Sequence, residues 1–178
     1  MPCAIRLLKT SQGSIEFYDS DEYERLVQAA RALDSTTLVC VLLGGDAGLR
    51  SGEMRALRWR DVNQETKQLC VERNDWRGHV STTKGGRLRH VPMTTRLAFA
   101  LREHRHLRGP LVLTGSDGAR LSEGAVVVRV RRAARQAGLG NTGPHILRHR
   151  AWRHFGDGPQ RRADPNGRNT SSGAEERI

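Results

Sequence analysis

The sequence predicts a mostly helical α+β fold with a small antiparallel β-sheet, and three observations carry this prediction. Apolar residues recur at helical spacing over most of the chain. Between about residues 67 and 92 the period shortens to two, as in half-buried strands. The length of 178 residues suits one domain with tails better than two domains.

Two helices open the domain. Asp19 followed by Glu22 forms a capping-box pattern, and the apolar spacing after it predicts a helix over 20–33. The stretch STTLVCVLLGGDAG is apolar almost all round, which predicts a buried second helix that ends at its glycines. Ser51 is the expected cap of a short third helix, GEMRALRW, so that Arg50 lies at the turn just before it.

The strands follow this third helix. The segments KQLCVER and VSTTKGGRLRHVPM alternate in polarity, and Gly85 and Gly86 divide the second of them. This pattern predicts a tight β-hairpin with Lys84 beside its tip.

Helical spacing returns in 94–107 and in 122–139, where Ser122 is the expected cap. A last helix is predicted to begin near Pro144, at a position where proline is tolerated. Residues 156–178 have almost no apolar side chain, so we expect a disordered polar tail there.

The charge of the chain points to a polyanion as its partner. The formal net charge is +11 and the pI is about 11.0, which favours nucleic acid. The sequence has no long apolar run, so no membrane partner is expected.

The sequence gives no support for a metal or a cofactor. It contains no CxxC or HExxH motif, and GGDAGLRSGE lacks the lysine and the spacing of a nucleotide-binding loop. Cys3, Cys40 and Cys70 lie far apart and are expected to be reduced, buried and inert.

Three boxes of residues in the right order resemble the catalytic domain of the tyrosine recombinases, the phage integrase family. The first box, a GLR-x-GE-x-x-x-L-x-W stretch, contains Gly48, Leu49, Arg50, Gly52, Glu53, Leu57 and Trp59. The second, a lysine followed by an R-x-VP strand, contains Lys84, Arg89, Val91 and Pro92. The third, H-x-LRH, contains His145, Leu147, Arg148 and His149.

The resemblance implies a phosphoryl-transfer site. In this family a tyrosine hydroxyl attacks a DNA phosphodiester, which forms a phosphotyrosyl link and frees a 5′-hydroxyl. Arg50 and Arg148 would bind the scissile phosphate, because a guanidinium stays protonated and pairs bidentately with phosphate oxygens. His145 would donate to the same phosphate or assist proton transfer. Lys84 would be the acid for the departing oxygen, a role that arginine cannot fill.

Each of these residues taken singly has a plainer interpretation. Arg50 could be a surface arginine, Lys84 a solvated turn residue, and His145 with Arg148 a basic helix face. Glu53 is expected to be a structural partner that orients Arg50 or caps its helix. Two further arginines, Arg87 and Arg89, are expected to contact DNA or merely to solvate a face, and Leu57 and Trp59 are expected in the core.

The resemblance stops at about His149, and no tyrosine follows it. The two tyrosines of the chain, Tyr18 and Tyr23, lie in or before the first predicted helix. Tyr23 fits the apolar stripe of that helix, whereas Tyr18 could be packed or exposed. A frameshift in an integrase gene, or a nucleophile supplied by a partner subunit, would explain this ending.

The sequence therefore predicts a short segment 1–18, an integrase-like catalytic domain over 19–155 that is incomplete at its carboxyl end, and the tail. The expected function is site-specific DNA recombination, by a cytoplasmic chain of bacterial or phage origin that binds duplex DNA but does not cleave it alone. Other recombinase subunits on the DNA are the further expected partners. The alternatives are a non-enzymatic DNA-binding module and a remnant that folds poorly.

Overall fold

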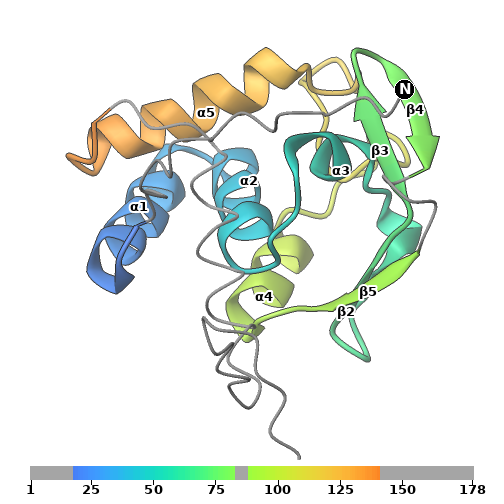
Figure 1. The fold of residues 1–178 in the computed structure, drawn as a ribbon, viewed down its shortest axis with the longest axis horizontal. Helices are drawn as coiled ribbons and strands as arrows, with labels where there is room; N and C mark the ends of the chain where they lie inside the picture. Colours follow the sequence, from blue (N-terminus) through green and yellow to red (C-terminus); the bar gives the residue numbers. More distant parts are fainter. Residues whose placement is uncertain (1–17, 83–87, 141–178) are drawn as a thin grey trace, which may run out of the picture.

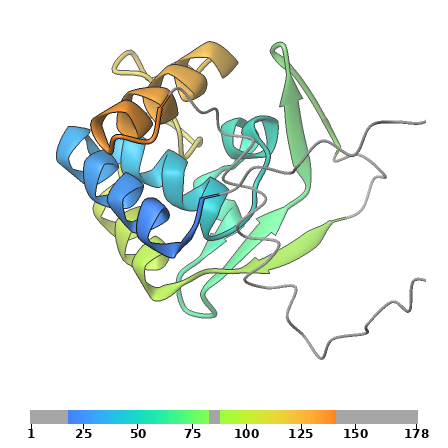
Figure 2. The same ribbon diagram turned by 60° about the vertical axis from the view of Figure 1, so that its left-hand side comes forward.

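The chain forms a group of helices on one side and strands on the other, with α3 between them (Figure 1; Figure 2). The structure is a computed structural model that describes residues 18–82 and 88–140. The helices are α1 (Ser20–Leu33), α2 (Ser35–Gly45), α3 (Ser51–Ala56), α4 (Thr95–Glu103) and α5 (Glu123–Gln136), with a 3-10 turn η1 (Trp59–Asp61). The strands are β1 (Val62–Asn63), β2 (Gln68–Val71), β3 (Arg73–Trp76), β4 (His79–Thr82) and β5 (Arg89–Pro92). The predicted fold class is confirmed.

Helices α1 and α2 lie where the sequence predicts them. The Glu22 N–H donates to the Asp19 carboxylate at 2.7 Å, and the Asp19 N–H donates to the Glu22 carboxylate at 3.0 Å, so the capping box is complete. Asp34 separates the two helices and caps α2, because its carboxylate accepts from the Thr37 N–H at 2.8 Å.

Helix α2 lies at the centre of the core. It contacts α1, α4 and α5, which explains why its sequence is apolar on nearly every side. Helix α5 begins at the predicted cap, where Ser122 Oγ accepts from the Ala125 N–H at 3.1 Å. In the two stretches that the structure describes, no helix has the length and the apolar run that crossing a bilayer requires.

The strands form two antiparallel sheets, and the predicted hairpin around Gly85 and Gly86 is wrong in its pairing. Strand β5 pairs with β2, and β1 pairs with the other edge of β2. Strand β4 pairs with β3 through a turn at Arg77 and Gly78, whose φ angles of 51° and 87° are both left-handed. The segments on either side of the two glycines therefore have different partners. Lys84 lies outside the described residues.

Helix α3 ends at Ala56, before the predicted end near Trp59, because the next residues pair with a distant segment. The Leu57 carbonyl accepts from the Val112 N–H at 3.0 Å, and the Trp59 N–H donates to the Pro110 carbonyl at 2.8 Å. The chain is therefore extended after Ala56. Leu57 and Trp59 are both buried, as predicted.

Helix α4 ends at Glu103, before the predicted end at Leu107, because His104 turns into the core. Its Nδ1 lies 3.0 Å from Ser35 Oγ, and its Nε2 lies 3.1 Å from the Val112 carbonyl oxygen. Burial lowers the pKa of His104, so the ring is a neutral, structural group. Leu107, which the periodicity assigned to the helix, is fully exposed.

The cysteines match the prediction only in part. Cys40 on α2 is free and buried, and burial raises its pKa to about 12. Cys70 is free but half-buried, because it alternates along β2 with the buried Leu69 and Val71. Cys3 lies outside the described residues.

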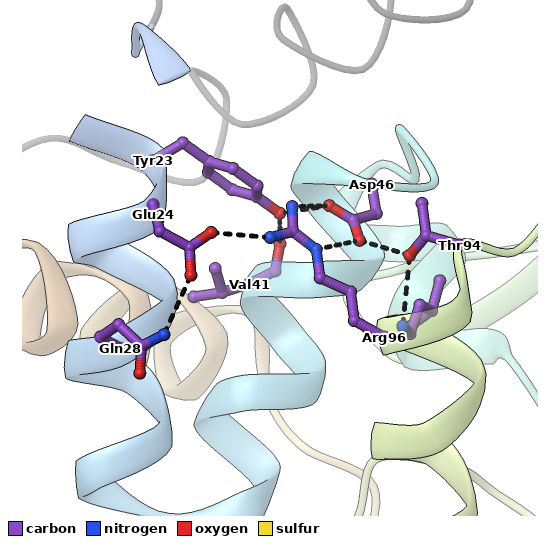
Figure 3. Close-up of polar contacts among 8 residues, drawn as sticks. Tyr23, Glu24, Gln28, Val41, Asp46, Thr94 and Arg96 are labelled. Carbon is purple, nitrogen blue, oxygen red and sulfur yellow. Dashed lines mark hydrogen bonds and ion pairs between the residues drawn. The ribbon is translucent and has the colours of Figure 1, made fainter. Parts of the chain in front are cut away.

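A buried carboxylate, Asp46, joins α1, α2 and α4 directly after α2 ends (Figure 3). It accepts from the Tyr23 hydroxyl at 2.9 Å and from the Thr94 hydroxyl at 2.5 Å. It also accepts from Arg96 Nη2 at 2.7 Å and Nε at 2.8 Å. The remaining Arg96 nitrogen, Nη1, donates to the Glu24 carboxylate at 2.9 Å, so one guanidinium connects three elements.

These donors keep Asp46 ionised inside the protein. Burial alone would raise the pKa of Asp46, but hydrogen bonds from Arg96, Thr94 and Tyr23 and the charge of Arg96 hold it below its ordinary value. The hydrogen bond to Asp46 in turn raises the pKa of Arg96. The Arg96 guanidinium also lies 5.1 Å from the centre of the Tyr23 ring, in a cation–π contact.

Gly45 at the end of α2 packs so closely against Tyr23 of α1 that an alanine at this position should destabilise the protein. A Cβ at Gly45 would lie 2.2 Å from the Tyr23 hydroxyl oxygen, so Gly45→Ala should destabilise the protein by about 1–3 kcal/mol through overpacking. The matched control is Gly124→Ala in α5, where the nearest atom, Ser122 Oγ, is 3.9 Å away. In urea unfolding, Gly45→Ala should be less stable than the wild type, and Gly124→Ala should be at least as stable as the wild type. Equal stability of wild type and Gly45→Ala would contradict the packing.

The ionised state of Asp46 predicts a dependence of stability on pH. Asp46→Asn should lower the free energy of unfolding at neutral pH by about 2 kcal/mol, the size of a hydrogen bond to a charged group. Because the pKa of Asp46 in the folded protein lies below its ordinary value of 3.8, its contribution is present above pH 3.8 and is lost as the pH falls through the folded pKa.

The difference between wild type and Asp46→Asn in urea unfolding should therefore shrink as the pH is lowered from neutral towards the folded pKa. Asp21→Asn, which changes an exposed carboxylate of α1, serves as the control and should have little effect. A difference that stays constant across this range would show that Asp46 is not held as an anion.

Candidate functional site

The Arg50 side chain projects into solvent from the start of α3. Gly48, with a left-handed φ of 65°, turns the chain after α2. Leu49 is buried, and its N–H donates to the Leu43 carbonyl at 3.0 Å. Arg50 then takes an extended conformation as the N-cap of α3, and its side chain is 53% exposed. Ser51 is thus the first helical residue and not the cap that the sequence predicts.

Glu53 is buried beneath Arg50 and is its structural partner, as the sequence predicts. The Arg50 N–H donates to Glu53 Oε2 at 2.8 Å, which is one half of a capping box. The reciprocal half is absent because an arginine side chain has no acceptor. Arg50 Nη1 also lies 3.3 Å from Glu53 Oε1, so the same carboxylate holds the backbone and the guanidinium of Arg50.

Arg89 on β5 binds the same carboxylate through both arms of its guanidinium. Its Nη1 and Nη2 lie 2.9 Å and 2.8 Å from the two Glu53 oxygens, in the bidentate geometry of a strong ion pair. Sequence reasoning placed Arg89 among the DNA contacts and did not connect it to Glu53. The contact depends on the pairing of β5 with β2, which the sequence did not predict.

The three groups together form a positively charged surface. Glu53 is 1% exposed, whereas Arg50 and Arg89 are 53% and 38% exposed. Burial alone would raise the pKa of Glu53, but the bonds from Arg89 and Arg50 hold it below its ordinary value, so it stays ionised. Two exposed cations around one buried anion leave an excess positive charge that faces solvent. Such a pair of oriented guanidinium groups can bind an anion such as phosphate.

A second buried carboxylate, Asp75 on β3, fixes the neighbouring hairpin and was missed by sequence reasoning. Arg55 of α3 lies 3.2 Å from it and also donates to the Asp75 carbonyl at 2.7 Å. Arg120 donates to Asp75 Oδ2 at 3.0 Å, and the Gly78 N–H donates to Asp75 Oδ1 at 2.8 Å. The signal in the sequence was the DWRG run, since aspartate at the first position is typical of a turn.

Helix α3 lies unusually close to β3, and Gly52 makes this approach possible. A Cβ at Gly52 would lie 2.3 Å from Asn74 Oδ1 and 2.5 Å from the Asp75 carbonyl oxygen. The first turn of α3, which follows Arg50, is therefore in direct contact with β3 at Asn74 and Asp75, close to the turn of the β3–β4 hairpin.

Both tyrosines of the chain belong to the core. Tyr23 is 1% exposed and donates to Asp46, so its predicted core position is confirmed. Tyr18, for which packing and exposure were both open, is 5% exposed, and burial raises its pKa to about 12. Neither hydroxyl faces solvent as an attacking group would have to.

The remaining predicted site residues are Lys84, Arg87, His145 and Arg148, and all four lie outside the described residues. Of the predicted set, Arg50 and Arg89 are the two that the structure describes, and Glu53 brings them together. Within the described part of the chain, no group of histidine, cysteine and carboxylate side chains is arranged to hold a metal ion.

Solved structures that match this fold include integrases and a recombinase. A Tn1549 transposon integrase in complex with transposon right end DNA matches with a TM-score of 0.72 at 14% identity, over 86% of this chain and 57% of that chain. A lambda integrase dimer bound to a core site matches with a TM-score of 0.63 at 21% identity, over 83% of this chain and 55% of the other. These likenesses show the fold.

The sequence relatives lead to the same family. The tyrosine recombinase XerC of Xanthomonas axonopodis pv. citri (strain 306) is 32% identical over 155 residues, which cover 82% of this chain. The chain spans 47% of the length of that relative. The family model of the phage integrases matches residues 16–156, most of the sequence. The chain therefore belongs to the phage integrase family.

Proposed function

We propose that the chain binds duplex DNA through the surface around Arg50, as part of the catalytic domain of a site-specific recombinase. The observation that carries this proposal is the exposed Arg50 guanidinium, held with Arg89 by the buried Glu53 carboxylate. Two oriented guanidinium groups with an excess positive charge are suited to phosphate. The net charge of +11 supports the same partner.

The family relationship supports a role in recombination. The curated relatives are named tyrosine recombinases, and solved neighbours include integrases bound to DNA. By extension, Arg50 and Arg148 bind the scissile phosphate, His145 assists them, and Lys84 is the acid for the departing 5′-oxygen. Arg87 and Arg89 contribute positive charge towards the DNA backbone. The reaction conserves the bond energy in the phosphotyrosyl link, so we infer no metal and no nucleotide cofactor.

The chain of 178 residues does not by itself supply the nucleophile. Its two tyrosines are core residues, and one of them donates its hydroxyl hydrogen to Asp46. We therefore propose that the attacking tyrosine lies outside these 178 residues, and another recombinase subunit on the same DNA is one source of it. Solved neighbours include a lambda integrase tetramer bound to a Holliday junction, so assembly of such subunits on DNA occurs within this fold. The proposed location is the cytoplasm of a bacterial cell, where the DNA substrate of such a recombinase lies.

The same observation favours a second function, a DNA-binding module without catalysis. In that case the arginines hold phosphates and no partner completes the reaction. The two functions differ in whether a subunit that carries a tyrosine, added in trans, yields a covalent protein–DNA complex on the strand that this chain contacts.

Binding of a labelled duplex should depend on Arg50. Arg50→Ala is expected to weaken binding about tenfold, the effect of losing one charge-assisted hydrogen bond, and to lower the salt slope by about one. Fluorescence anisotropy at several salt concentrations measures both quantities. Arg31→Ala, which removes an exposed arginine from α1, is the matched control and should change affinity by less than about twofold. Equal losses for the two variants would mean that Arg50 has no special contact with DNA.

A duplex that traps cleaved intermediates should give no covalent adduct with this chain alone. The expected result on a denaturing gel is free DNA at all protein concentrations, because both tyrosine hydroxyls are buried. An adduct that forms with the wild type, and disappears in Tyr18→Phe or Tyr23→Phe, would overturn the proposal that the nucleophile must come from elsewhere.

A further inference from the structure

The β3–β4 hairpin carries an exposed tryptophan at its tip. In Figure 1 and Figure 2 the two strands extend away from the helical group, on the side where α3 lies. Trp76 is 61% exposed, and the Arg77 guanidinium lies 5.0 Å from the centre of its ring. The hairpin therefore presents an aromatic face and a positive charge side by side to solvent.

The residue before the exposed tryptophan is buried and firmly held. Asp75 is fully buried and is held by Arg55 and Arg120, and its second oxygen accepts from the Gly78 N–H. Arg77 and Gly78 form a two-residue turn with left-handed φ angles, the geometry that suits the twist of a tight hairpin. The Trp76 side chain is therefore presented from a fixed frame.

The exposed chemistry of this hairpin favours nucleic acid over protein. Asp75 is the single carboxylate in 73–82, and its charge is buried and paired with arginines. The exposed residues after it include Trp76, Arg77 and His79, and then Val80 and the hydroxyl groups of Ser81 and Thr82. Cationic and hydroxyl donors contact phosphates, and an aromatic face can pack against the sugars beside them.

The hairpin lies beside the Arg50 surface. The first turn of α3 touches Asn74 and Asp75, so closely that Gly52 has no room for a side chain. Arg55 of the same helix binds Asp75. One short helix thus joins Arg50, at its start, to the part of β3 that directly precedes Trp76.

We propose that Trp76 and Arg77 form a second contact with the DNA duplex, in which Arg77 binds a backbone phosphate and the Trp76 indole packs against the neighbouring sugars. The inference rests on the proposed function, because it takes the duplex at Arg50 as given. It adds a contact that belongs to none of the three boxes that carry the family resemblance.

The experiment compares two matched pairs of an aromatic residue and an arginine on the full chain. The double variant Trp76→Ala/Arg77→Ala removes the hairpin tip. The control, Phe99→Ala/Arg102→Ala, removes a pair on α4 in which the ring is 54% exposed and the guanidinium lies 5.4 Å from its centre. Each variant is titrated with a labelled duplex, and its thermal unfolding is recorded.

The hairpin variant should bind the duplex about tenfold more weakly than the wild type, in line with the loss of one charge-assisted hydrogen bond to a phosphate, while the control stays within about twofold. A direct readout is tryptophan emission, which should fall when unlabelled duplex is added to the wild type and stay constant in Trp76→Phe. Trp76→Phe should keep most of the affinity, because a ring remains.

Three outcomes would overturn the inference. If the wild type binds DNA and Arg50→Ala weakens it, but the hairpin variant binds like the wild type, the hairpin contact is wrong and the proposed function stands. If the hairpin variant instead changes the oligomeric state in sedimentation without changing DNA affinity, the tip is a protein interface. If the wild type does not bind duplex DNA at all, the proposed function and this contact fall together.

Discussion

The buried carboxylate of Asp46 is the constraint on which the rest of the structure depends. An ionised group inside a protein is tolerated only when its oxygens are fully paired, and here the donors come from α1, from α4 and from the loop before α4. These elements must therefore be in place together before Asp46 can be buried. Because Asp46 directly follows α2, its buried contacts also fix the point at which the chain leaves the core, just before Arg50.

A second buried carboxylate, Glu53, holds the other end of the same segment. Between Asp46 and Glu53 the chain makes a left-handed turn, buries Leu49 and then exposes Arg50. The exposed guanidinium is thus placed by two anchors that lie on either side of it in the sequence. Arg50 thus combines an exposed guanidinium with a backbone that is fixed on both sides.

The chain uses arginine for nearly all of its positive charge, and the buried pairs give a physical reason. Asp46 and Glu53 are each bound by an arginine that donates to both carboxylate oxygens, and Arg55 contacts both the carboxylate and the backbone carbonyl of Asp75. A lysine ammonium is a point charge and would leave carboxylate oxygens unpaired in these positions. The chain has three lysines, Lys9, Lys67 and Lys84; Lys67, the one that lies among the described residues, is exposed.

The sequence was sufficient for features that depend on neighbouring residues. The bounds of α1 follow from the Asp19 capping box, and the exposure of Arg50 follows from its place before a short helix. The pairing of Arg89 with Glu53 could not be predicted, because it joins residues 36 positions apart through the β2–β5 register. The hairpin was misassigned for a related reason: a glycine pair is a stronger turn signal than Arg77–Gly78, and the Asp75 bond that closes the real turn is visible only in the fold.

The positions of the two tyrosines limit which residue can be the nucleophile. Tyr23 cannot be both the donor that helps to keep Asp46 ionised and a nucleophile on a phosphate, because attack would require its hydroxyl to leave the core. Leaving would remove a partner from a buried charge and loosen the segment that carries Arg50. The scaffold that positions Arg50, the proposed phosphate-binding residue, therefore excludes Tyr23 from the proposed reaction. A nucleophile for this site therefore has to be a tyrosine whose hydroxyl is not needed to hold Arg50 in place.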